Sequence, residues 1–245
     1  MASLEHKTEP DSAWATELEL RCAIADAYRA LGQRSMNHAS TGNISCRHED
    51  RILITPSGID YDAITADSIV AINWRGEVEG RYIPSCEWQM HLEIYRVQPE
   101  AGAVVHTHSD ACVALSCLRR PIPAFHYMVA AFGGNDIPCA PYAPFGSHEL
   151  ACYATRALAS RTACLLANHG MVCHGPILAT AISTAIKLET LARQYLMALQ
   201  AGIPILLTEA QVSAAQEQLE EYCAAADAQC SVPSEIPHRA GRPAH

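Results

Sequence analysis

Hydrophobic residues recur at helical spacing in several parts of the chain. Between residues 13 and 32 the apolar side chains fall mostly three or four positions apart, and Gly32 is the expected stop of this helix. A second helix is expected to start at Ser85, as its N-cap, and to carry Trp88, His91, Leu92 and Tyr95. The same spacing predicts further helices over residues 112–118, 147–160, 176–201 and 209–224.

Short apolar runs between these helices predict strands. They cover residues 41–45, 52–55, 68–74, 102–108 and 163–167, and another apolar run follows the turn at 168–170. Residues 120–146 are rich in Pro, Gly and aromatic side chains, and no element is assigned there. Strands and helices alternate without a regular βαβ rhythm. The prediction is a single α/β domain over residues 13–228, with a central, mostly antiparallel or mixed sheet flanked by helices and loose tails at 1–12 and 229–245.

Composition narrows the class of protein. The chain has 245 residues, 49% of them apolar and 18% charged, which is typical of a globular domain and excludes a disordered chain. The formal net charge of −9 disfavours binding to nucleic acid and to anionic membranes. No apolar run reaches about 18 residues, and residues 1–12 do not resemble a secretory signal peptide. Eleven cysteines without a CxxC pair favour free thiols in a reducing compartment, and we expect the cytoplasm.

Three histidines and one glutamate could form a metal site. His106 and His108 share a predicted strand, so their side chains point to the same face of the sheet. His169 follows another strand in a tight turn, and Glu87 is expected just inside the start of the second helix. Three imidazoles and one carboxylate favour Zn²⁺ over Mg²⁺ or Ca²⁺. Ordinary hydrogen-bonded histidines remain the alternative, because spacing alone does not bring these residues together.

A second group of residues resembles an anion cradle. The loops Thr41-Gly42-Asn43 and Ser57-Gly58 offer small residues, hydroxyls and backbone N–H groups, and Ser85 adds a hydroxyl near a helix start. Such groups can hold phosphate without a basic residue. The alternative is that these are three ordinary surface turns.

Five motifs, in this order, resemble the class II aldolase/adducin family. They are Gly42-Asn43-Ile44-Ser45, Leu53-Ile54-Thr55-Pro56-Ser57-Gly58, Pro84-Ser85-Cys86-Glu87-Trp88, Val105-His106-Thr107-His108 and Asn168-His169-Gly170. The resemblance covers roughly residues 15–225. Within the family, the segment from Phe125 to Tyr142 is especially similar to the fuculose-phosphate aldolase branch.

The resemblance implies a role for each matching residue. The implied zinc ligands are Glu87, His106, His108 and His169, with Glu87 also the catalytic acid/base; the implied phosphate-binding residues are Asn43, Ser57, Gly58 and Ser85. Tyr127 matches a tyrosine that serves the aldehyde end of the substrate, Phe145 an aromatic at the hydrophobic end, and Tyr222 a tyrosine that closes over the site. The resemblance also implies a homotetramer with active sites between neighbouring subunits.

Cys86 departs from the family pattern. It stands where the family usually has the second serine of a Ser-Ser-Glu run, so a strong hydroxyl donor to phosphate is replaced by a weak S–H donor. The backbone N–H of residue 86 is retained. We expect a phosphorylated ketose to remain the preferred substrate, because the other cradle residues are present.

The expected function is that of a zinc-dependent aldolase. It would cleave a ketose 1-phosphate to dihydroxyacetone phosphate and a small aldehyde such as lactaldehyde. A pentulose-phosphate 4-epimerase, a methylthioribulose-phosphate dehydratase and a 5-deoxypentulose-phosphate aldolase are alternatives on the same scaffold. An adducin-like interaction domain is an alternative of another class, and it predicts missing metal ligands, whereas all four residues are present here.

Overall fold

The structure is a computed structural model, and it describes residues 16–230. An eight-stranded sheet forms the centre of the molecule. The strand order is β4-β3-β2-β1-β5-β10-β9-β8, and every neighbouring pair is antiparallel except the parallel pair β8–β9. The predicted single-domain α/β fold with a mostly antiparallel, mixed sheet is confirmed. The strands are β1 (Asn43–His48), β2 (Arg51–Ile54), β3 (Val70–Asn73), β4 (Val78–Glu79), β5 (Ala103–Thr107), β8 (Cys139–Ala140), β9 (Ala163–Leu166) and β10 (Gly170–Gly175).

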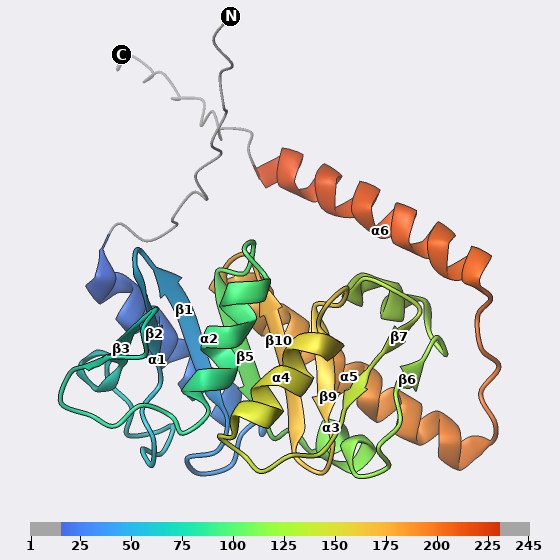
Figure 1. Cartoon of the computed structure of the whole chain (residues 1–245). Helices are drawn as coiled ribbons and strands as arrows, with labels where there is room; N and C mark the ends of the chain where they lie inside the picture. Colours follow the sequence, from blue (N-terminus) through green and yellow to red (C-terminus); the bar gives the residue numbers. More distant parts are fainter. Residues whose placement is uncertain (1–15, 231–245) are drawn as a thin grey trace, which may run out of the picture.

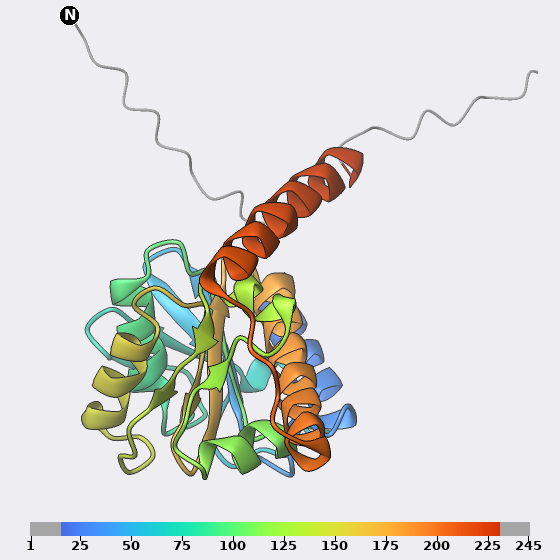
Figure 2. The ribbon, with the colours of Figure 1, turned by 90° about the vertical axis from the view of Figure 1, so that its right-hand side faces the viewer.

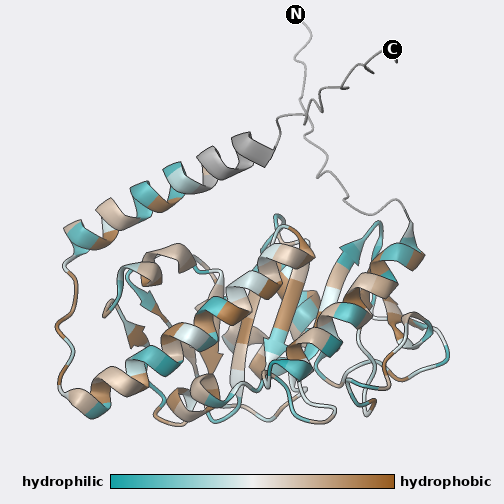
Figure 3. Ribbon diagram, turned by 180° about the vertical axis from the view of Figure 1, so that it is seen from behind, coloured by the Kyte–Doolittle hydropathy of each residue, from teal (hydrophilic) through white to brown (hydrophobic). Residues whose placement is uncertain are grey.

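Helices cover both faces of the sheet. α1 (Glu17–Gln33), α3 (Asp110–Ser116) and α5 (Leu178–Ala201) pack on one face, and α2 (Trp88–Val97) and α4 (His148–Ala157) pack on the other (Figures 1 and 2). Each face has its own hydrophobic core, because strand side chains alternate between the two sides. Seen from the α1 and α5 side, the strands behind these two helices are mainly hydrophobic, whereas hydrophobic and hydrophilic residues alternate along the helices (Figure 3).

The Pro- and Gly-rich segment without a predicted element folds into short pieces. They are β6 (Ile122–Pro123), the 3₁₀-helix η2 (Tyr127–Phe132), β7 (Asp136–Ile137) and β8, with β6 and β7 forming a separate two-stranded sheet. The last helix, α6 (Glu209–Cys230), extends beyond the rest of the fold (Figure 1). Its first half packs on η2 through Val212, Ala215 and Leu219. A second 3₁₀-helix, η1 (Ala66–Ser68), precedes β3.

The ends of the first and last helices differ from the prediction. α1 begins at Glu17, because Thr16 and Glu19 form a capping box there, and residues 13–15 lie outside the described part of the chain. Gly32 is not the helix stop but lies inside α1, where a Cβ atom would overlap the ring of Tyr61. At the other end, residues 229–230 continue α6 instead of starting a tail. The predicted tails 1–12 and 231–245 lie outside the described residues.

Within residues 16–230, we find no helix that is both long enough and apolar enough to span a bilayer.

Candidate metal centre and substrate cavity

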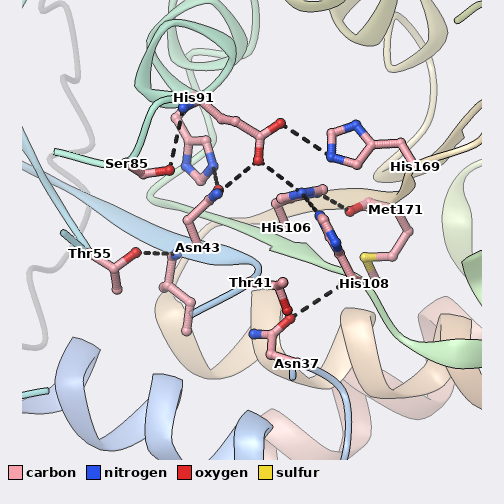
Figure 4. Close-up of polar contacts among 12 residues, drawn as sticks. Asn37, Thr41, Asn43, Thr55, Ser85, His91, His106, His108, His169 and Met171 are labelled. Atoms are coloured by element: carbon pink, nitrogen blue, oxygen red, sulfur yellow. Dashed lines mark hydrogen bonds and ion pairs between the residues drawn. The ribbon is translucent and has the colours of Figure 1, made fainter. Parts of the chain in front are cut away.

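The centre of the sheet brings two histidines together. β5 lies between β1 and β10, and His106 near its end is fully buried. The Nε2 atoms of His106 and His108 are 2.9 Å apart, as the alternation of side chains along a strand predicted. The rings of His106, His108 and His169 meet edge to face, and every pair of ring centroids is 4.8 Å apart (Figure 4).

Glu87 is placed by the loop before α2. Two backbone bonds, Ser57 N–H to Ile83 O and Ser85 N–H to Thr55 O, hold this loop against the turn after β2. The prediction that Ser85 is the N-cap is wrong: α2 starts at Trp88, and Glu87 itself occupies the N-cap position instead of the first turn. The Ser85 hydroxyl accepts the Glu87 N–H at 3.3 Å, so it still orders the approach to the helix.

His169 reaches the cluster from the turn between β9 and β10. Asn168 has a left-handed backbone with φ of 54°, and a Cβ atom on Gly170 would overlap the carbonyl oxygen of Thr107. This tight turn directs His169 Nε2 to 3.4 Å from Glu87 Oε1, and Glu87 Oε2 is 3.0 Å from His106 Nε2. One ligand atom from each of Glu87, His106, His108 and His169 lies within 4.8 Å of the others.

Two observations test whether these residues fit a metal ion. His106 Nδ1–H donates to the carbonyl oxygen of Met171 at 2.8 Å, which leaves the Nε2 lone pair facing the cluster. Glu87 Oε1 is buried and has no hydrogen-bond partner among the described residues. A buried oxygen without a partner is costly, and a bound cation would satisfy it. Three imidazoles and one carboxylate therefore form a donor set that could hold a metal.

Proton equilibria at three of the four groups, Glu87, His108 and His169, favour the charge states that a metal needs. Burial would raise the pKa of Glu87, but His106, His169 and the Asn43 amide outweigh it and hold this pKa well below its ordinary value. Burial and the neighbouring His106 lower the pKa of His108 to about 3 and that of His169 to about 4. Burial would lower the pKa of His106, yet Glu87 raises it overall. At neutral pH the carboxylate is ionised and His108 and His169 are neutral, as ligands must be.

A chain of buried polar groups, which the sequence did not reveal, supports Glu87 from behind. Asn43 Nδ2 donates to Glu87 Oε2 at 3.0 Å, and Asn43 Oδ1 is 2.5 Å from His91 Nε2. The other ring nitrogen of His91 is 2.7 Å from the Ser45 hydroxyl, which is 2.9 Å from the Tyr95 hydroxyl. The sequence pattern alone places His91 on the apolar face of the helix, with no polar role. The signal that could have found it is a histidine four residues after Glu87, one helical turn along.

A cavity of about 470 Å³ opens over the cluster. Its wall contains all the residues that the family resemblance assigns to phosphate or to the hydrophobic end of the substrate, namely Asn43, Ser57, Gly58, Ser85, Cys86 and Phe145. Glu87, His108 and His169 line the same cavity, whereas His106 lies beneath it. Of the described residues around the cavity, none is Lys or Arg, so an anion there would rely on hydroxyls and backbone N–H groups.

Two residues implied by the resemblance do not meet the cluster within one chain. Tyr127 begins η2 and is 52% exposed, and Tyr222 lies on α6 and is 74% exposed. Neither belongs to the described lining of the cavity.

Comparison with known proteins identifies the family. Residues 22–196 match the family model of the class II aldolase and adducin N-terminal domain. The chain belongs to this family. The resemblance inferred from the five motifs is thereby confirmed, and the relatives support an aldolase-type lyase.

The relatives carry two different substrate names. A 5-methylthioribulose-1-phosphate/5-deoxyribulose-1-phosphate aldolase of Rhodospirillum rubrum is 43% identical over 207 residues, which cover 84% of this chain and 94% of that protein. An L-fuculose phosphate aldolase of Haemophilus influenzae is 42% identical over 205 residues, which cover 83% of this chain and 95% of that protein. A solved structure of an L-fuculose 1-phosphate aldolase superposes with a TM-score of 0.80 at 34% identity, covering 82% of this chain and 96% of the other.

Proposed function

We propose that this chain is a zinc-dependent aldolase that cleaves a ketose 1-phosphate to dihydroxyacetone phosphate and a small aldehyde such as lactaldehyde. One observation carries the proposal: Glu87 and three imidazoles converge at a cavity whose wall also holds the hydroxyls of Ser57 and Ser85. Glu87, His106, His108 and His169 would hold the zinc ion. Bound zinc would act as a Lewis acid for the negative charge that develops on substrate oxygens during carbon–carbon cleavage.

Glu87 is the proposed acid/base. Its carboxylate is ionised at neutral pH and lies at the cavity wall, so it can accept and return a proton where a substrate carbon lies. Retro-aldol cleavage breaks the bond between C3 and C4, and the C4 hydroxyl gives its proton to Glu87 as the aldehyde forms. Glu87 then delivers that proton to C3, which becomes a carbon of dihydroxyacetone phosphate.

The proposed phosphate cradle consists of Asn43, Ser57, Gly58 and Ser85, with the backbone of Cys86. The backbone bonds between residues 55–57 and 83–85 support it, because they hold two of its loops side by side at the cavity. The Asn43 side chain is only 3% exposed and already contacts Glu87, so its part in the cradle would be its single remaining amide hydrogen. Phe145, 71% exposed at the cavity, would contact the apolar end of the aldehyde.

Tyr127 and Tyr222 would act on the cavity of a neighbouring copy. Both are exposed on a single chain and lie outside its own cavity lining, which is compatible with a homotetramer that has intersubunit active sites. In that arrangement, Tyr127 serves the aldehyde end of the substrate and Tyr222 closes over it.

The chain is proposed to work in the cytoplasm, as a catalytic domain over residues 13–228. The support for a reducing compartment is that each of the nine cysteines whose side chains the structure describes is a free thiol. Burial raises the pKa of Cys46, Cys164 and Cys173, so these thiols stay protonated in the core. We propose no nucleic-acid or membrane partner.

Aldolases for methylthioribulose or 5-deoxyribulose phosphates are the second candidate, because the Rhodospirillum rubrum relative carries that name. A panel of ketose 1-phosphates, assayed with and without a chelator and followed by product analysis, separates the candidates. Release of an aldehyde supports an aldolase, and the best substrate identifies its type. A C4 epimer would instead indicate an epimerase, loss of water a dehydratase, and the absence of any turnover an adducin-like interaction domain.

A further inference from the structure

The hydrogen-bond chain behind Glu87 has only one arrangement of protons. A carboxylate that binds a metal can only accept hydrogen bonds, so the Asn43 atom that faces Glu87 is the Nδ2 donor and Asn43 Oδ1 faces His91. An amide oxygen only accepts, so His91 Nε2 must carry a proton. The donor and acceptor character of Glu87 and His91 therefore fixes the orientation of the Asn43 amide.

The remaining proton positions in this series of hydrogen bonds are fixed because the His91 ring is neutral. Burial, with a further contribution from His106, lowers the pKa of His91 to about 3, so the ring carries a single proton at neutral pH. With Nε2 protonated, Nδ1 is bare and accepts the Ser45 hydroxyl proton at 2.7 Å. The Tyr95 hydroxyl then donates to Ser45, whose hydroxyl and carbonyl oxygens are each 2.9 Å away. Every group in this series donates toward Glu87, and Figure 4 shows the contact between His91 and Asn43.

We infer that His91 is a positioning residue for the reaction: its Nε2–H holds the Asn43 amide in the one orientation that points a donor at Glu87. Without that N–H, the buried Asn43 oxygen has no hydrogen-bond donor among the described side chains, and the amide would turn or shift to find one. Such a shift would weaken the Asn43 donor to Glu87, and Glu87 would lose the support that keeps it facing His106 and His169. The inference rests on the proposed role of Glu87 as metal ligand and acid/base.

Two substitutions of similar size separate this role from simple core packing. His91→Gln can place an amide N–H near the position of Nε2 and keep the donor to Asn43, whereas His91→Met fills the space without any donor. Both lose the bond to Ser45, so both are expected to lower the melting temperature. Zinc affinity is measured by competition with a chromophoric chelator, and kcat and KM with whichever ketose 1-phosphate the wild type cleaves.

The expected result is a split between the two variants. His91→Met loses about 10–100-fold in zinc affinity and in kcat, the range seen when a partner of a metal ligand is removed. His91→Gln stays within about 3-fold of the wild type in both, and KM changes little in either variant. Equal zinc affinity and kcat in folded His91→Met and wild type, or equal losses in both variants, would overturn the inference.

A spectroscopic measurement tests the proton arrangement directly. A long-range ¹H–¹⁵N spectrum of the zinc-loaded wild type is expected to contain one imidazole, absent in His91→Gln, with a protonated Nε2 and a bare Nδ1. The opposite tautomer, or an imidazolium, would overturn the inference. The zinc competition and this spectrum need no substrate. A wild type that cleaves no ketose phosphate would therefore refute the proposed function and still leave the role of His91 to be decided.

Discussion

Gly42 and Asn37 are packed so closely that a Cβ atom on Gly42 would overlap the Asn37 side-chain oxygen. That oxygen accepts the backbone N–H of His108 at 3.3 Å, so the contact lies directly beside the metal cluster. Gly42 also has a left-handed backbone with φ of 70°, which an L side chain rarely adopts. The loop before β1 and the loop after β5 thus hold each other in place.

Substituting this glycine is expected to destabilise the protein. Gly42→Ala adds a steric overlap to the backbone cost, and we expect a loss of about 2–4 kcal/mol in the free energy of unfolding. Gly58→Ala is the matched control, because Gly58 has φ of 72° but open space where its Cβ atom would lie. It should lose only about 1–2 kcal/mol. Urea unfolding measures both, and equal losses would contradict the packing argument.

Glu189 anchors the helix that follows His108. Its two carboxylate oxygens accept the N–H groups of Ala111 and Cys112, each at 3.1 Å, in the first turn of α3. Glu189→Gln turns one of these acceptors into a donor and leaves a buried N–H unpaired. We expect a loss of about 1–3 kcal/mol in the free energy of unfolding.

Arg193→Ala is the control for this substitution. It removes only the contact of an exposed guanidinium with Glu189 at 3.5 Å and should change stability by less than about 0.5 kcal/mol. Thermal unfolding compares the two variants. Equal decreases in melting temperature would mean that the bonds from Glu189 to the first turn of α3 contribute nothing beyond the ion pair.

Introducing the serine that the family usually has at position 86 tests whether this residue contributes to phosphate binding. Cys86 lines the cavity, and partial burial together with the neighbouring Glu87 raises the pKa of its thiol, so it offers only a weak S–H donor. A hydrogen bond to a charged group contributes about 1.5–3 kcal/mol. Cys86→Ser should therefore lower KM for the phosphorylated ketose by about 10-fold or more relative to the free ketose.

Cys22→Ser, at an exposed position on α1, serves as the control and should leave this KM ratio unchanged. If Cys86→Ser also leaves the ratio unchanged, position 86 does not contact the phosphate.

Acid should destabilise the protein partly through His91. Burial holds the pKa of this ring at about 3 in the folded chain, against about 6.5 in an unfolded chain. Between these values the unfolded state binds more protons. The stability contributed by neutral His91 is therefore complete above pH 6.5 and is lost as the pH falls, by up to about 1.4 kcal/mol per pH unit.

His91→Gln removes this titration. From pH 7 to pH 5, the chelator-treated wild type should lose about 2 kcal/mol more of its unfolding free energy than the equally treated variant. Urea unfolding at the two pH values gives the comparison, and parallel losses would show that His91 does not titrate in this way.

Local patterns in the sequence predicted much of the fold and the types of residue in the site. Alternation along one strand was enough to place His106 and His108 on a common face, because that relationship is local. Their meeting with His169 and Glu87 depends on the order of β1, β5 and β10 in the sheet, which no short pattern encodes. The prediction that the four residues converge came from the resemblance of the motifs to the family.

Other features depended on contacts between distant segments. Ser85 has the composition of an N-cap, yet the loop is bound to the turn after β2, and the helix starts later, at Trp88. His91 lies at an apolar helix position, so spacing could not distinguish a core residue from a partner of Asn43. Tyr127 and Tyr222 are exposed and lie outside the described lining of their own cavity, and their predicted roles depend on a neighbouring copy.

The most direct test of the account is the metal content of the purified protein and its relation to turnover. We predict one zinc ion per chain, loss of ketose 1-phosphate cleavage after EDTA treatment, and recovery on addition of zinc. His169→Ala should fail to retain the metal, whereas His148→Ala, which removes an exposed imidazole at the start of α4, should retain it. A purified, unchelated chain without a bound divalent metal, or turnover unaffected by metal removal, would contradict the account.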